Sequence, residues 1–180
     1  MIVVISGTNR PNSKTRIVAE AAFAHFKEKA KEEVRFFSLE DLPDDILHID
    51  MYDPEQQSSA LRAIQEQYLI APNKLFIVAP EYNGSYPGVL KLFLDACSIY
   101  AYQESFQGGK KAALVGVAAG RAGNLRGMEH LTGVLNYLQI TVMPQQLPIS
   151  SIGAQLEESG ELLAASQKAL EEQAERFLAF

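Results

Sequence analysis

The chain has 180 residues, a formal net charge of −6, 47% hydrophobic residues and 21% charged residues. This length and balance suit one globular domain over residues 1–180, which can bury a sufficient core without disulfides or a structural metal. The acidic balance argues against a general nucleic-acid binder, and no run approaches the ~20 apolar residues of a membrane-spanning helix. We therefore expect no nucleic-acid and no membrane partner.

The only cysteine, Cys97, has no second cysteine with which to form an internal disulfide. This excludes a disulfide-stapled secreted scaffold and favours a reducing compartment. Residues 1–7 lack the basic start and the length of a signal peptide, and they are typical of a strand. We therefore expect a cytoplasmic protein.

Short apolar runs alternate with longer amphipathic segments along the chain. Continuous β-branched runs are typical of strands that are covered on both faces. The predicted strands are residues 2–5, 34–37, 75–79, 112–118 and 140–143, the last extended to 149. Apolar positions at helical spacing predict the helices between them. The predicted helices are residues 14–31, 55–70 (with Asp53 as N-cap and Pro54 first), 87–98, 125–138 and 161–177.

This order of elements is five repeats of strand and helix, which predicts an α/β fold with a doubly wound parallel sheet and helices on both faces. Five strands favour the order 2-1-3-4-5, and a (β/α)8 barrel needs about 250 residues. Such sheets bind ligands at the carboxyl ends of their strands, between strands 1 and 3. The loops after strands 1, 3 and 4 are therefore the candidate site.

The first of these loops, residues 6–15, is polar and leads into a helix, whose free N–H groups favour an anion. It contains one glycine, Gly7, so the Gly-x-Gly-x-x-Gly dinucleotide motif is absent, and Asn12 stands where a P-loop has its second glycine. The pattern favours a phosphate monoester, and the alternative is a polar turn in which Ser13 is an ordinary N-cap. The candidate phosphate-binding side chains are Thr8, Arg10, Ser13 and Thr15.

The second and third loops are rich in glycine. Residues 80–88 contain two tyrosines, two prolines and two glycines, which suit the edge of a flat heterocycle. Ser85 or Tyr86 before Pro87 also suits a helix cap, but capping does not require Asn83 and Gly84. Residues 118–124 are small and allow close backbone approach to a ligand at Gly120, or simply room for turns.

At these residues the chain resembles the NADPH-dependent FMN reductase family of flavodoxin-like proteins, which includes flavin, quinone, chromate and azo-dye reductases. The resemblance extends over residues 2–149 and is most specific at residues 80–91. The first loop is similar to the family pattern Gly-Ser-x-Arg-x-x-Ser, with Thr8 in the serine position, and the third loop is similar more loosely. Leu92 stands where many relatives have Asn, and the chain has no tryptophan to stack on a flavin.

The resemblance implies FMN as the cofactor and NADPH or NADH as the co-substrate. The first-loop residues would hold the FMN phosphate, and Gly120 would approach the ring from the side opposite the second loop. The second-loop residues that would line the ribityl chain and the ring, mostly through backbone, are Pro80, Glu81, Tyr82, Asn83 and Gly84. Family members are usually dimers or tetramers, which implies a homodimer or a homotetramer.

The implied function is an NAD(P)H oxidoreductase that passes a hydride through FMN to a quinone, azo compound, metal oxyanion or free flavin. The alternatives are a non-enzymatic, flavodoxin-type electron carrier and a relative that has lost its flavin. Because the cofactor carries the chemistry, no catalytic side chain is expected. The scattered His25, His48 and His130 predict no metal site, and Lys91 and Asp95 are spaced as an ion pair on one helix.

Overall fold

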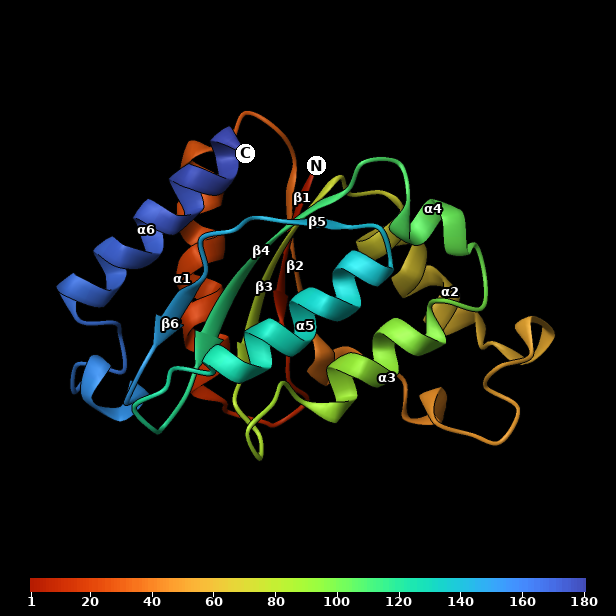
Figure 1. The fold of residues 1–180 in the computed structure, drawn as a ribbon, viewed down its shortest axis with the longest axis horizontal. Helices are drawn as coiled ribbons and strands as arrows, with labels where there is room; N and C mark the ends of the chain where they lie inside the picture. The colour runs from red at the N-terminus through yellow and green to blue at the C-terminus, as the bar shows by residue number, and fades with distance from the viewer.

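A parallel sheet with helices on both faces forms the centre of the computed structural model, which describes residues 1–180 (Figure 1). Its strands are β1 (Ile2–Ser6), β2 (Val34–Ser38), β3 (Lys74–Pro80), β4 (Lys111–Val117), β5 (Thr141–Val142) and β6 (Leu147–Ile149). Its α-helices are α1 (Lys14–Lys29), α2 (Ser59–Gln65), α3 (Gly88–Ala96), α4 (Tyr102–Phe106), α5 (Leu125–Tyr137) and α6 (Ala164–Ala179). The short α4 was not predicted.

The strand order is β2-β1-β3-β4-β5, all parallel, which confirms the doubly wound, flavodoxin-like prediction. The prediction of five strands is wrong by one, because the last segment is split into β5 and β6. β5 pairs with Lys111 and Ala112 at the start of β4, and β6 pairs with the end of β4. Pro144 lies between the two pieces and has no N–H to give to a continuous ladder.

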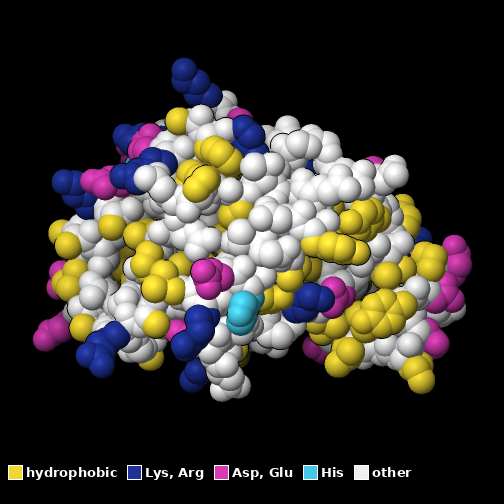
Figure 2. Space-filling view, viewed as in Figure 1, with side chains coloured by type: hydrophobic (Ala, Val, Ile, Leu, Met, Phe, Trp, Pro, Cys, Tyr) yellow, Lys and Arg dark blue, Asp and Glu magenta, His cyan; other side chains and the backbone are white.

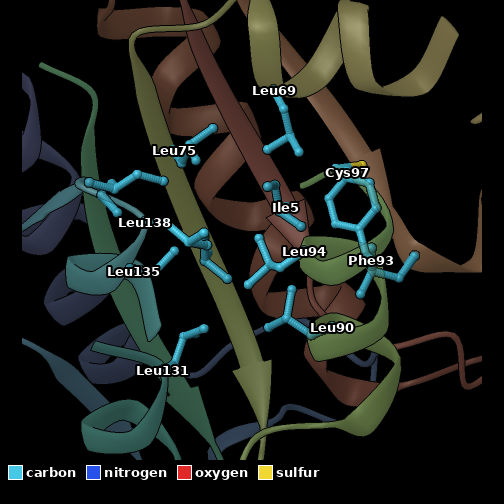
Figure 3. Packing of buried hydrophobic residues seen from close by; sticks show 14 of the residues in the cluster. Ile5, Leu69, Leu75, Leu90, Phe93, Leu94, Cys97, Leu131, Leu135 and Leu138 are labelled. Carbon is cyan, nitrogen blue, oxygen red and sulfur yellow. The ribbon is translucent and has the colours of Figure 1, made fainter. Parts of the chain in front are cut away.

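Alternate residues of the strands supply two cores. Ile2 and Val4 of β1 pack with α1 and α6 on one face, whereas Val3 and Ile5 face the other side, beneath α3 and α5. Figure 1 shows α1 beside α6 on one side of the sheet and α3 and α5 on the other. Figure 3 shows leucines of α3 and α5 that converge on Ile5 and the neighbouring strand. Each fully buried leucine contributes about 1.5–3 kcal/mol, so these faces fix the helices onto the sheet.

The start of α1 follows the sequence prediction. Ser13 has extended backbone angles and its hydroxyl accepts the N–H of Arg16 at 3.2 Å, as an N-cap does. Lys27 and Lys29 lie in the last turn, where cations oppose the partial negative charge of the helix end. The cap begins α1 at the end of the loop that follows β1, at the carboxyl edge of the sheet.

The helix predicted over residues 55–70 is wrong at its start. Asp53 caps only a short 3-10 turn, Pro54–Gln56, and the hydroxyl of Ser58 makes the hydrogen bond that begins α2. Past Gln65 the chain continues as a π-helical segment, and the buried amide of Gln65 donates to backbone carbonyls beyond α3. Local periodicity does not report such a tertiary hydrogen bond. None of the helices combines the length and the apolar character needed to cross a bilayer.

Candidate cofactor site

A cleft of about 790 Å³ opens at the carboxyl edge of the sheet. Its walls come from residues 10–15, 80–82, 117–119 and 151–154. The first three segments follow β1, β3 and β4, so the loops singled out in the sequence meet around one cavity, as the doubly wound topology requires. The fourth segment follows β6 and reaches the same edge because β6 runs parallel to β4.

The first wall of the cleft offers positive charge and free backbone donors. Arg10 and Lys14 are exposed and make no ion pair, in contrast to Arg16, whose guanidinium lies 2.8 Å from the carboxylate of Glu20. The backbone N–H groups of residues 13–15 have no acceptor within the chain, as expected in the first turn of a helix. Two free cations and a helix start fit a phosphate group.

Of the predicted phosphate ligands, Arg10, Ser13 and Thr15 line the cleft and Thr8 does not. The Thr8 side chain is fully buried, its hydroxyl lies 2.8 Å from the hydroxyl of Tyr82, and it accepts the N–H of Arg10 at 3.2 Å. Its structural role is thus to join the first loop to the second from beneath the cleft.

The second loop is a two-residue hairpin. Tyr82 and Ser85 exchange backbone hydrogen bonds of 2.8 and 3.1 Å, and Asn83 and Gly84 between them have φ of 52° and 82°. A turn with positive φ at both central positions selects Asn-Gly, so the turn geometry itself explains this dipeptide. The N–H groups of Glu81 and Tyr82 are already bonded, which leaves those of Asn83 and Gly84 as the free backbone donors of the hairpin.

Residues at the start of α5 hold this loop in place. The buried amide of Asn124 donates to the carbonyls of Ala79 and Pro80, at 2.9 and 3.0 Å. This amide thereby connects the loop before α5 to the end of β3. The guanidinium of Arg126, the second residue of α5, lies 3.4 Å from a carboxylate oxygen of Glu81. No local pattern predicts this contact, since it joins residues 45 positions apart.

The third loop needs glycine at a position that sequence reasoning missed. Gly123 has φ of 58°, and a Cβ there would lie 2.6 Å from the side chain of Pro148. A Cβ on Gly120 would meet nothing within 4 Å, and Gly120 is not among the residues that line the cleft. Ala118 and Ala119 form this wall instead.

Two further parts of the cleft were not predicted. Lys14 lines it, and a Cβ on Gly153 in the fourth segment would lie 3.3 Å from the Lys14 ammonium. The signal for the fourth segment was a polar stretch, Ser150 and Ser151, after a run of strand-forming residues at the same sheet edge. The prediction of a single strand up to residue 149 did not recognise the segment after it as part of the site.

Other reactive side chains lie away from the cleft. The predicted pair of Lys91 and Asp95 is confirmed, with a nitrogen–oxygen distance of 2.6 Å, and this hydrogen bond raises the pKa of Lys91. Cys97 is buried in the core, and burial raises the pKa of its thiol. No group of three or more His, Cys, Asp or Glu side chains is placed to hold a metal ion.

Comparison with known proteins decides the family. Residues 1–154 match the model of the NADPH-dependent FMN reductases, a span that contains every residue of the cleft. The chain belongs to this family. The description of this family, NADPH-dependent FMN reductase, agrees with the cofactor and the enzymatic class that the sequence resemblance implied.

The individual relatives match either a part of the chain at higher identity or most of it at lower identity. The chain is 44% identical over 84 residues to a 2-hydroxy-1,4-benzoquinone reductase of Burkholderia sp., covering 47% of this chain and 45% of that protein. It is 26% identical over 162 residues to an NADPH azoreductase of Bacillus sp. (strain OY1-2), covering 89% of this chain and 82% of that protein. The first match thus spans less than half of the relative.

Solved structures support the fold. The chain superposes on the flavoenzyme NAD(P)H:(acceptor) oxidoreductase FerB of Paracoccus denitrificans with a TM-score of 0.80 at 20% identity. The superposition covers 99% of this chain and 94% of that one. The agreement confirms the flavodoxin-like architecture.

Proposed function

We propose that this chain is an FMN-dependent NAD(P)H oxidoreductase that delivers the electrons of a nicotinamide to a small organic acceptor. The observation that carries the proposal is the cleft, which has free cations and free helix amides at one wall and Pro80, Glu81 and Tyr82 of the second loop at another. Bound FMN supplies the hydride transfer chemistry. The family match supports this function over the electron carrier, since its members are named as reductases that use NADPH.

The residues of the cleft divide into two groups by the part of FMN that they suit. Arg10, Lys14 and the amides at the start of α1 would hold the phosphate, because a dianion is stabilised by charged donors and by a helix N-terminus. In the second loop, next to the cleft residues 80–82, the free amides of Asn83 and Gly84 do not themselves line the cleft and would donate to the polar edge of the ring. Amides that are fixed by a tight turn stabilise developing negative charge without reorganisation.

We propose quinones and azo compounds as acceptors. The named relatives reduce a hydroxylated benzoquinone and an azo substrate, which are flat, conjugated and reducible by two electrons. Metal oxyanions and free flavin are the further acceptor classes that the resemblance implies, and NADPH and NADH both stay open as reductants. A cytoplasmic location agrees with the single buried thiol of Cys97, which fits a reducing compartment.

We further propose a homodimer formed through α3 and α5. Between these helices lies a hollow of about 580 Å³ that contains the Lys91–Asp95 ion pair. On α5, Tyr137 is 81% exposed and Leu125 is 51% exposed. Figure 2 shows hydrophobic side chains gathered on the face of the molecule that α3 and α5 form. In a dimer with twofold symmetry, this face of one copy would pack against the same face of the other copy. Each copy would then contribute its own Lys91–Asp95 pair and cover the apolar side chains of its partner.

Sedimentation analysis tests the assembly, with Tyr137→Glu as the variant. The substitution places a carboxylate of each subunit in the proposed interface, where it would be desolvated and would repel the carboxylate of the other subunit. We therefore expect the wild type to sediment as a dimer and the variant as a monomer. A tetramer would show that a second surface also takes part. A monomeric wild type would refute the proposal.

The reaction itself is tested by adding FMN to the purified protein and then NADPH or NADH without oxygen. We expect the flavin absorbance near ~450 nm to change shape on binding and to bleach with nicotinamide at a catalytic rate. Re-oxidation by a quinone or an azo dye then ranks the acceptors. Binding without bleaching by either nicotinamide would favour the electron carrier, and failure to bind FMN would refute the assignment of the cleft.

A further inference from the structure

His130 contacts the hairpin of the second loop, Tyr82 to Ser85, directly. Its Nδ1 lies 2.9 Å from the hydroxyl oxygen of Ser85, the residue that closes the turn around Asn83 and Gly84. The ring is on α5, so this hydrogen bond joins a helix to a loop that lies 45 residues earlier. Sequence patterns predict no role for His130, because nothing local indicates a partner so far along the chain.

Two consecutive turns of α5 reach the same segment. Arg126 and His130 are four residues apart and therefore lie on one face of the helix. Arg126 contacts Glu81 at one end of the hairpin segment, and His130 contacts Ser85 at the other. The Arg126 side chain is 67% exposed, so its ion pair adds little. The hydrogen bond between His130 and Ser85 is the contact made directly at the turn.

The imidazole also lines the hollow between α3 and α5. The Nδ1 atom is thus hydrogen-bonded to the hairpin, while the ring borders the hollow between α3 and α5. The titratable or charged groups around it are Lys91 and Asp95 of α3, Tyr102 of α4, Arg126 and Tyr137 of α5, the preceding residue Glu129, and Glu81 and Tyr86 on either side of the hairpin. Lys91 and Asp95 are paired with each other, and no carboxylate forms an ion pair with His130.

We propose that His130 is a positioning residue for FMN, which acts through Ser85 by setting the direction of their hydrogen bond. This inference rests on the proposed function. A neutral ring with a bare Nδ1 accepts the hydroxyl proton of Ser85. A protonated ring donates its Nδ1–H to the Ser85 oxygen instead, so the hydroxyl proton of Ser85 is released to donate elsewhere.

The protonated state also places a positive charge one hydrogen bond from the turn. Both effects favour a ligand atom with partial negative charge at the hairpin, such as a carbonyl oxygen at the polar edge of the flavin ring. By linkage, a ligand that binds the protonated state more tightly must raise the pKa of His130 by the corresponding amount. Proton uptake at His130 and FMN binding are therefore coupled.

Histidine side-chain NMR measures this coupling without any catalytic assay. The chain has three histidines, and His25, bonded to Glu175 at 2.9 Å on the opposite face of the sheet, and His48 serve as internal references. We expect FMN to raise the pKa of His130 by about half a unit or more and to leave the other two unchanged. FMN binding that leaves all three pKa values unchanged, or shifts them equally, would overturn the inference while the proposed function stands.

Affinity measurements with variants give the reciprocal test. His130→Asn keeps a hydrogen-bonding group near the Nδ1 position but does not titrate, and His25→Asn is the matched control. The ratio of wild-type to His130→Asn affinity for FMN should rise about two- to threefold from pH 8 to pH 6, since half a pKa unit corresponds to about threefold at most. Taking this ratio cancels the ionisation of the FMN phosphate, which occurs near pH 6.

Ser85→Ala identifies the route of the coupling. Without the hydroxyl, the response of the His130 pKa to FMN should become clearly smaller, because only the through-space effect of the charge is left, although the variant still binds FMN. A response of undiminished size in Ser85→Ala would show that His130 does not act through Ser85. If the wild-type protein does not bind FMN at all, both the inference and the proposed function are overturned.

Discussion

The hydroxyl groups of Thr8 and Tyr82 lie 2.8 Å apart, although 74 residues separate them in the chain. This hydrogen bond connects the loop after β1 with the loop after β3. We expect Tyr82→Phe to lower the free energy of unfolding by about 1 kcal/mol, the usual contribution of one hydrogen bond. We also expect weaker FMN binding, because the two loops are no longer tied.

Urea denaturation and FMN titration of Tyr82→Phe measure both effects. Tyr68→Phe is the control, since the Tyr68 ring stacks on Phe37 and its hydroxyl makes no hydrogen bond within the chain. If Tyr82→Phe behaves like Tyr68→Phe in both experiments, the contact does not organise the cleft.

Arg10→Ala and Lys14→Ala should each weaken FMN binding by about 1.5–3 kcal/mol, or roughly 10- to 150-fold. The reason is the loss of a charged donor to the phosphate. Riboflavin, which has no phosphate, should bind both variants as it binds the wild type. Lys31→Ala, an exposed lysine beyond the far end of α1, is the matched control. An equal loss for riboflavin would show that these cations do not act on the phosphate.

The two glycines of the third loop should respond differently to alanine. Gly123→Ala combines positive φ with a contact of 2.6 Å to Pro148, and we expect it to lower the free energy of unfolding by about 2–4 kcal/mol. Gly120→Ala has open space around the new methyl group and should leave stability within about 0.5 kcal/mol.

FMN titration of Gly120→Ala then tests the predicted approach of this residue to the ring. A folded variant with weakened FMN binding supports that approach, since the methyl group meets no protein atom. Unchanged affinity would remove Gly120 from the cofactor site.

The thiol of Cys97 should make stability depend on pH in alkaline solution. Burial raises its pKa in the folded protein, whereas in the unfolded chain the thiol ionises near ~8.5. The unfolded state therefore loses this proton first as the pH rises. The contribution is complete below about pH 8.5, and above it stability should fall by about 1.4 kcal/mol per pH unit.

Urea denaturation between pH 8 and pH 10 measures this fall, and Cys97→Ala is the comparison. The variant has a cavity cost that does not vary with pH, so the difference between the two proteins isolates the thiol. Lys110, whose pKa burial lowers, is present in both and cancels. Parallel curves for the two proteins would contradict the prediction.

Local pattern was sufficient for most of the fold. Continuous apolar runs such as residues 75–79 define strands because both faces of a doubly wound sheet are covered. Ser13 marks the start of α1 because its hydroxyl meets the local need of a helix for an N-cap. The order of strands followed from the number of repeats, and the positions of Arg10 and Tyr82 in the cleft followed from that order.

Long-range contacts decided the rest. Asn83 and Gly84 owe their identity to a hairpin, and Gly123 owes its identity to the packing of β6, which no periodicity reports. The burial of Thr8 against Tyr82 and the contact of His130 with Ser85 join residues that only the folded chain brings together. The sequence by itself determined the sheet, its edge and the loops at that edge, because these depend on local propensity and burial. Which atoms face the ligand was decided by the tertiary structure, because hydrogen bonds between distant segments orient each loop.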